Sequence, residues 1–211
     1  MPDYDYQSDL RPFSAVLDDI GAKTDEKLYL GELINAFGER GFGALMVFFG
    51  LINAIASPIP GSTTLLGAPL LVICLHLVTR RDQLWMPAWA LKASLPRASY
   101  RATIDKVRKP LIQVERLSRP RFSIMSSEVS EVLIGIVTSL LTVIIMLPLF
   151  GGNLFPSLFV ALFGFGLMQR DGLLIGAAWL GVAGFCVFVW AAWSLIVTAT
   201  TLSLKWFQQI F

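Results

Sequence analysis

Small polar residues and glycines gather at two points where long uncharged stretches are interrupted. The stretches run from Gly41 to Thr79 and from Val132 to Gln169, and the interruptions read SPIPGSTT over 57–64 and PLFGGNLFP over 148–156. A helix that restarts after such a break presents unpaired backbone N–H groups and the positive end of its dipole, which favour an anion. Glycine lets a ligand approach the backbone closely. These residue types predict a substrate-binding site for an anionic group, made of Pro58, Pro60, Gly61, Ser62, Thr63, Thr64, Gly151, Gly152, Asn153 and Pro156.

The same breaks have a second interpretation. Proline and glycine also mark tight turns outside a membrane, and the sequence leaves both interpretations open. In the binding-site interpretation, Ser62, Thr63 and Thr64 cap one restarted helix, and Asn153 caps the other. Polar backbone at membrane depth persists only where protein or a water-filled cavity satisfies it, so two matched breaks favour a functional role.

Charged residues stand near the ends of the two uncharged stretches. In membrane proteins such residues more often anchor the topology or contact lipid phosphates than line a pathway. Gating or lipid contact is therefore predicted for Glu39, Arg40, Arg80, Arg81, Arg170 and Asp171.

Residues for the common kinds of catalysis are sparse. Cys74 and Cys186 lie far apart in apolar segments, and His76 is the only histidine, so neither a disulfide nor a zinc site is expected. No P-loop, dinucleotide fingerprint or nucleophile elbow occurs in the sequence. We therefore expect that the protein is not an enzyme and has no catalytic residue, metal, cofactor or nucleic-acid partner.

The composition is typical of a polytopic membrane protein, with 55% hydrophobic residues, 15% charged residues and a mean hydropathy of +0.66. Helical spacing of apolar residues predicts short amphipathic helices over about 10–20 and 30–37. It also predicts a basic amphipathic helix around 100–114 that lies in the membrane interface. The predicted fold is all-α: a polytopic helical membrane protein with two broken-helix repeats, whose arms either re-enter or span, plus interfacial amphipathic helices.

Five segments follow from this pattern. They are cytoplasmic amphipathic helices over 1–40, membrane repeat 1 over 41–82, a basic interfacial amphipathic segment over 83–126, membrane repeat 2 over 127–171, and a C-terminal transmembrane helix over 172–211.

Charge gives the expected orientation of these segments. Residues 1–40 carry nine acids and four bases, whereas residues 80–121 carry eleven bases and three acids. The positive-inside bias places the basic block in the cytoplasm. This predicts five membrane passes, parallel repeats and a cytoplasmic N-terminus, with an inverted pair of repeats as the open alternative.

Several motifs together resemble the ExoD family of bacterial membrane proteins, named for exopolysaccharide synthesis. The motifs are LGEL at 30–33, GERGFGA at 38–44, PIPGSTTLLGAPLL at 58–71, LWMP at 84–87, GNLFP at 152–156 and QRDG at 169–172. The resemblance covers most of the chain from residue 28 onward. It implies a multi-pass protein of the bacterial inner (cytoplasmic) membrane linked to surface polysaccharide production, and it supplies no reaction and no catalytic residue.

The leading hypothesis is a small helical transporter or a protein that handles a lipid carrier. Its substrate would carry an anionic group, as a polyprenyl phosphate does, and would bind between the two breaks. Membrane lipids, anionic headgroups and a second copy in a homodimer are the expected partners. The alternative is a non-transporting membrane scaffold for polysaccharide assembly, and a weaker third hypothesis is a membrane enzyme that acts on lipid-linked sugars.

Overall fold

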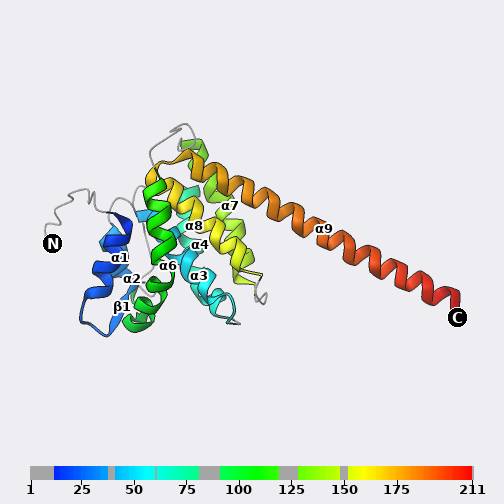
Figure 1. Cartoon of the computed structure of the whole chain (residues 1–211), viewed down its shortest axis with the longest axis horizontal. Helices are drawn as coiled ribbons and strands as arrows, with labels where there is room; N and C mark the ends of the chain where they lie inside the picture. Colours follow the sequence, from blue (N-terminus) through cyan, green and yellow to red (C-terminus); the bar gives the residue numbers. More distant parts are fainter. Residues whose placement is uncertain are drawn as a thin grey trace.

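The computed structural model describes residues 12–37, 41–59, 61–80, 91–118, 128–147 and 152–210. Helices make up nearly all of this part of the chain, with one short pair of strands. The predicted all-α class is therefore confirmed. Figure 1 shows a bundle of helices, a layer of further helices over one flank, and one long helix that extends away from both.

The bundle consists of four apolar helices: α3 (Gly41–Ala56), α4 (Ser62–Val78), α7 (Glu128–Met146) and α8 (Leu154–Gln169). Helix α3 contacts α8 and α4, and helix α7 contacts the same two helices. As a result, α3 and α7 occupy opposite corners of the bundle. The first hairpin turns at Pro58 and Gly61, because proline disfavours helix in the residue before it and Gly61 has a φ of 80°.

Glycines bring α3 and α8 unusually close together. A Cβ atom on Gly50 would lie 2.8 Å from both the Ser157 carbonyl oxygen and the Ala161 nitrogen. A Cβ atom on Gly164 would lie 2.7 Å from the Gly43 carbonyl oxygen. The early part of α3 thus meets the late part of α8, so the two helices run antiparallel.

Helices α4 and α7 are antiparallel in the same way. A Cβ atom on Gly135 would lie 2.9 Å from the Val78 nitrogen, and one on Gly67 would lie 2.6 Å from Cγ of Met146. Both hairpin turns therefore lie at one end of the bundle, which we call the tip end. The end that holds Val78 and Gly135 is called the closed end. The two hairpins point in the same direction within the bundle, and their being repeats in a membrane stays a prediction.

A layer of three helices covers the α3 side of the bundle: α1 (Phe13–Ala22), α2 (Leu30–Phe37) and α6 (Arg97–Leu117). Two strands, β1 (Lys27–Tyr29) and β2 (Ser94–Pro96), pair antiparallel within it. The sequence analysis did not predict these strands. Three residues are too few for an alternating pattern, and each strand needs a partner far away in the sequence.

Side chains of α6 hold both ends of α1. At the start of α1, the Glu115 carboxylate accepts hydrogen bonds from the Phe13 backbone N–H, at 2.5 Å, and from Ser14 Oγ, at 2.6 Å. In the middle of α1, the Tyr100 hydroxyl donates to the Leu17 carbonyl oxygen at 2.9 Å, and near its end Arg101 Nε donates to the Gly21 carbonyl oxygen at 2.6 Å. The carboxylate meets the positive end of the helix dipole and satisfies an N–H group that lacks an intrahelical acceptor.

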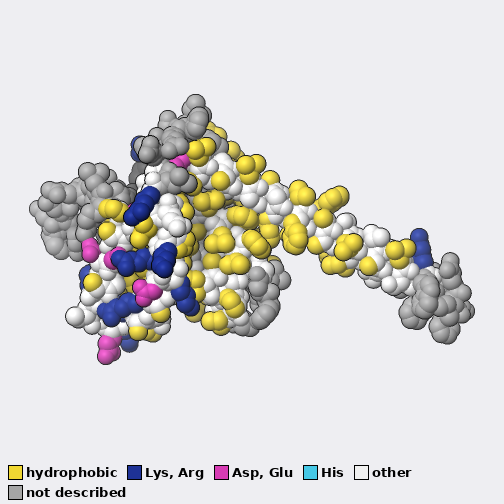
Figure 2. Space-filling model, in the orientation of Figure 1, with side chains coloured by type: hydrophobic (Ala, Val, Ile, Leu, Met, Phe, Trp, Pro, Cys, Tyr) yellow, Lys and Arg dark blue, Asp and Glu magenta, His cyan; other side chains and the backbone are white. Residues whose placement is uncertain are grey.

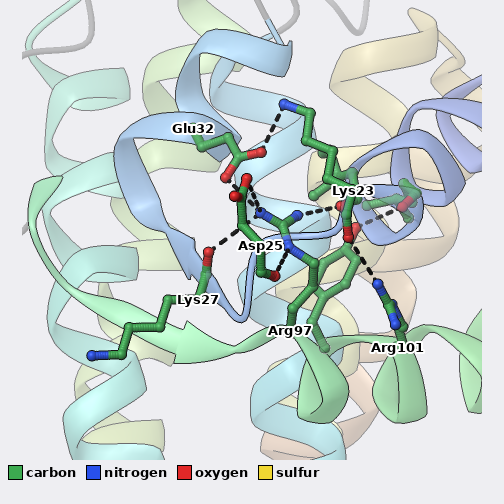
Figure 3. Close-up of polar contacts among 9 residues, drawn as sticks. Lys23, Asp25, Lys27, Glu32, Arg97 and Arg101 are labelled. Carbon is green, nitrogen blue, oxygen red and sulfur yellow. Dashed lines mark hydrogen bonds and ion pairs between the residues drawn. The ribbon is translucent and has the colours of Figure 1, made fainter.

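Arg97 is the most heavily bonded side chain of this layer, and Figure 3 shows its contacts. Its guanidinium donates to the carbonyl oxygens of Ile20, of Asp25 at 2.8 Å and of Lys27 at 3.3 Å. It also donates to the Glu32 carboxylate at 3.0 Å. The Arg97 side chain is 2% exposed. A buried arginine needs such a full set of acceptors, so Arg97 joins α1, α2 and β1 to the start of α6.

The charge of Glu32 is stabilised by this network. Burial raises the pKa of its carboxyl group, but hydrogen bonds from Lys23, at 2.7 Å, and from Arg97 lower it by more. The pKa of Glu32 is therefore below its ordinary value, and the carboxylate is ionised at neutral pH.

The basic amphipathic helix predicted around 100–114 is present as α6, and Pro110 lies inside it without ending it. Its apolar face is covered by protein. Tyr100, Ile104, Val107 and Leu111 are buried, and the Tyr100 ring centroid lies 5.8 Å from that of Phe48 in α3. The position of α6 relative to a membrane stays a prediction.

Helix α9 (Gly172–Ile210) is the long helix of Figure 1. It begins along α8, where the ring centroids of Phe163 and Trp179 lie 5.4 Å apart and those of Phe155 and Phe185 lie 6.4 Å apart. Two spans among the described residues are long and apolar enough to cross a membrane, Val129–Met146 and Gly172–Ser203. The other three bundle helices are shorter, so the predicted five passes stay a prediction.

Candidate functional site

The two predicted breaks meet at the tip end of the bundle. Asn153 Nδ2, at the second break, donates a hydrogen bond to Thr63 Oγ1, at the first break, over 2.9 Å. Five buried polar residues lie in the helix ends and turns at this end of the bundle, and we call them the tip junction: Asn53, Ser57, Thr63, Asn153 and Ser157.

Asn153 holds the end of α7 as well as the first hairpin. Its Nδ2 group lies 2.9 Å from the Ile145 carbonyl oxygen and 3.0 Å from the Leu147 carbonyl oxygen. Both partners are acceptors, so the amide orientation that points Nδ2 toward them is the favourable one. Asn153 Oδ1 consequently points elsewhere, and it is buried without a hydrogen-bond partner in the described structure.

The hydroxyl groups of Ser62 and Thr64, at the first break, bond to backbone carbonyl oxygens and do not cap a helix start as predicted. Ser62 Oγ lies within hydrogen-bond distance of the Ala56 and Ile59 carbonyl oxygens, and Thr64 Oγ1 donates to the Met146 carbonyl oxygen at 2.7 Å. The residues at the N-cap positions of α4 and α8 make no side-chain capping bond. The predicted capping was therefore wrong: these donors satisfy the carbonyl groups that end α3 and α7.

Three buried oxygen atoms of the tip junction lack a hydrogen-bond partner within the described structure: Asn53 Oδ1, Ser57 Oγ and Asn153 Oδ1. Asn53 Nδ2 donates to the Phe49 carbonyl oxygen of its own helix at 2.9 Å, which fixes the amide so that Oδ1 is the unpaired atom. Two of the three atoms are carbonyl oxygens, which can only accept, and the third is a hydroxyl that can accept.

Helix geometry places these atoms on facing surfaces. Asn53 and Ser57 follow Gly50 by three and seven residues, so they share the face of α3 that touches α8. Asn153 precedes Ser157 by four residues on the facing side of α8. Because the helices are antiparallel, both sets lie at the tip end. The sequence analysis missed Asn53, Ser57 and Ser157 as site residues, although their spacing from Gly50 and Asn153 was a readable signal.

The remaining predicted binding residues are divided. Pro58, Gly61 and Gly152 are exposed at the tip end, and Pro156 is buried at the start of α8. Pro60 and Gly151 lie outside the described residues, as do Glu39, Arg40 and Arg81 of the predicted gating set.

Arg80, Arg170 and Asp171 lie at the closed end, far from the tip junction along the bundle. Both arginines have positive φ, 50° and 51°, and terminate α4 and α8 in a left-handed conformation that usually belongs to glycine. Asp171 Oδ1 accepts from the Leu173 N–H at 3.0 Å and so caps α9. Ser118 Oγ donates to Asp171 Oδ2 at 3.3 Å and ties α6 to this end. Backbone geometry at the two arginines and side-chain contacts of Asp171 thus shape the closed end, and the predicted gating or lipid contact of these residues stays a prediction.

The chain matches the family described as "Exopolysaccharide synthesis, ExoD" over residues 13–191. It is 27% identical to Protein ExoD of Rhizobium meliloti over 164 residues, which are 75% of this chain and 68% of that protein. It is 30% identical to an uncharacterized protein of Synechocystis over 151 residues, which are 70% of each chain. No solved structure matches the chain. This protein therefore belongs to the ExoD family of exopolysaccharide synthesis.

Proposed function

We propose that this protein is a membrane protein of exopolysaccharide production that binds a saccharide, free or linked to a lipid carrier, at the tip junction. The observation that carries the proposal is a set of three buried acceptor oxygens, on Asn53, Ser57 and Asn153, that find no donor among the residues that the structure describes. A sugar presents hydroxyl groups, which donate hydrogen bonds to such atoms.

The energy of the unpaired atoms supports a ligand. Each buried polar atom without a partner costs about 1–3 kcal/mol, and such groups in a native structure are uncommon. A protein that keeps three of them at one end of a bundle gives up stability there. A ligand that supplies donors recovers this energy on binding. The unpaired oxygens therefore favour a ligand with donors over one without them.

The hydrogen bonds at the tip end argue against the anionic ligand that the sequence predicts for this site. An anionic group needs donors, but the side-chain amide of Asn153 and the hydroxyls of Ser62 and Thr64 are already bonded to protein acceptors. For a polyprenyl-phosphate-linked sugar, we therefore assign recognition at the tip junction to the sugar and not to the phosphate.

Asn53→Leu is the variant that tests the site. Leucine has a similar volume, and Asn53 bonds only to its own helix, so the variant should fold and should be more stable than the natural protein. We expect exopolysaccharide yield to fall more than tenfold in a host strain that lacks its own copy. Thr138→Val is the matched control, because Thr138 is also buried and bonded within its own helix but has no unpaired atom.

The control should keep full yield. If Asn53→Leu is more stable and also keeps full yield, the unpaired oxygen of Asn53 has no part in function and the proposal fails. A loss of stability in Asn53→Leu, measured by thermal unfolding in detergent, would also count against the unpaired state of this oxygen.

A further inference from the structure

Charged and apolar side chains occupy different sides of the molecule. Figure 2 shows Lys and Arg gathered over the α6 side, and hydrophobic side chains over the opposite side of the bundle and along α9. The exposed charges of α6 include Lys106, Arg108 and Lys109. This division limits how the bundle can meet a bilayer.

The charged layer lies beside the bundle and not beyond one end of it. Tyr100 of α6 packs on Phe48 in the middle of α3, and Ser118, just after α6, reaches Asp171 at the closed end. Lys106, Arg108 and Lys109 therefore lie between the middle of the bundle and its closed end. A lysine or arginine at the centre of a bilayer costs at least about 2.5 kcal/mol, so a bundle buried to its full length would place several such groups in hydrocarbon.

The tip end has the opposite character. Large apolar side chains are exposed around both hairpin turns and the adjoining helix ends: Ile59, Leu65, Leu147, Leu154, Phe155 and Leu158. Helix α7, at the corner away from α3, continues this surface with a row of exposed residues at alternating spacings of four and three: Val129, Leu133, Ile136, Leu140 and Val143.

The length of helix α9 can be compared with the thickness of a bilayer. It has 39 residues, about 58 Å, which is nearly twice the hydrocarbon thickness of about 30 Å. Its first part packs along α8 as far as Phe185, which contacts Phe155 near the tip end. Residues 186–204 then extend past the tips, carry no charge, span about 28 Å and are followed by Lys205. This free part alone matches the bilayer core.

We infer that residues 186–204 of α9 cross the bilayer once, and that the bundle meets the membrane surface by its tip end, which includes the last turns of α7. The α1–α6 layer then faces water. This arrangement places the exposed apolar side chains around the two hairpin turns against the membrane and keeps the basic residues of α6 out of hydrocarbon. It also places the tip junction at the depth of lipid headgroups. The inference does not depend on which ligand binds there.

Depth measurements on spin-labelled protein test this arrangement. Single cysteines are introduced as Ile59→Cys at the tip end, Leu195→Cys in the free part of α9 and Lys109→Cys on the charged layer, each in a Cys186→Ser background. All three replaced side chains are exposed, so the fold should tolerate the labels, and Cys74 is buried and stays in place. The labelled proteins are reconstituted in vesicles of phosphatidylethanolamine and phosphatidylglycerol, and nitroxide accessibility to oxygen and to a nickel chelate gives the depth.

We expect the label at 195 near the bilayer centre, the label at 59 at headgroup depth and the label at 109 in water. A membrane-impermeant maleimide should reach Ile59→Cys and Lys109→Cys from the same side of sealed vesicles. A label at 59 near the bilayer centre would show that the hairpins insert tip first. Reaction of Ile59→Cys only from the side opposite to Lys109→Cys would show that the arms span the membrane. Either result overturns the inference.

Discussion

Replacing Arg97 should detach the N-terminal layer from the start of α6. The Arg97→Met variant removes four hydrogen bonds, three to carbonyl oxygens and one to the Glu32 carboxylate. Removing one partner of a buried ion pair costs about 3–5 kcal/mol. Because Glu32 is 22% exposed, water partly screens the pair and we place the loss at about 3 kcal/mol.

Arg108→Met is the matched control on the same helix. Arg108 pairs with Asp18 at 2.7 Å, but the two side chains are 52% and 41% exposed. An exposed pair of this kind contributes about 0–1 kcal/mol. The two variants remove the same guanidinium group and keep a similar aliphatic chain, so their difference isolates the effect of burial and of the carbonyl contacts.

Hydrogen exchange read by mass spectrometry is the suitable assay, because it follows α1, β1 and α2 separately from the bundle. A loss of about 3 kcal/mol corresponds to a decrease in protection of roughly 100-fold in residues 13–37. Arg108→Met should change protection by less than about fivefold. Equal effects of the two variants would refute the assignment of Arg97 as the residue that joins this layer together.

Three further predictions address packing, pH and the tip junction. Gly50→Ala should destabilise the bundle by about 1–3 kcal/mol in thermal unfolding, since its Cβ would meet backbone atoms of α8, whereas Gly184→Ala has open space around it and should be neutral or slightly stabilising. The natural protein should have a larger free energy of unfolding than the Glu32→Gln variant. This difference should be complete above about pH 5 and should decline as the pH falls through the lowered pKa of Glu32, and a difference that does not depend on pH would contradict the ion pair. Asn153→Ala, unlike Asn53→Leu, should lower the free energy of unfolding by at least about 1 kcal/mol, because the carbonyl oxygens of Ile145 and Leu147 lose their donor. An unchanged melting temperature would contradict the role of Asn153 as the donor to the end of α7.

Helix boundaries at the two breaks could be read from the sequence, since the local physics of proline and glycine decides them. α8 begins at Leu154 directly after Asn153, as predicted, whereas α4 begins at Ser62 directly after Gly61 and includes the three residues that were expected to cap it. The amphipathic helices α1, α2 and α6 were also predicted by the spacing of their apolar residues.

The hydrogen-bond partners of polar side chains could not be predicted from the sequence. Ser62 and Thr64 can bond either to the helix they begin or to the helix that ends beside them, and only the tertiary arrangement decides between these acceptors. Arg97 was not singled out, because one arginine in a basic segment looks like its neighbours until its surroundings are known. Asn53 was missed although its spacing from Gly50 places it on the same face of the helix.

Binding of a lipid-linked sugar tests the central claim about the tip junction most directly. The natural protein and the Asn53→Leu variant, both in mild detergent, are titrated with polyprenyl phosphate and with polyprenyl-phosphate-linked glucose, and the melting temperature is followed. We predict that only the glycosylated lipid raises the melting temperature of the natural protein, and that Asn53→Leu loses this response while keeping its fold. An equal response to both lipids, or a full response in Asn53→Leu, would contradict recognition of sugar hydroxyl groups by the unpaired oxygens.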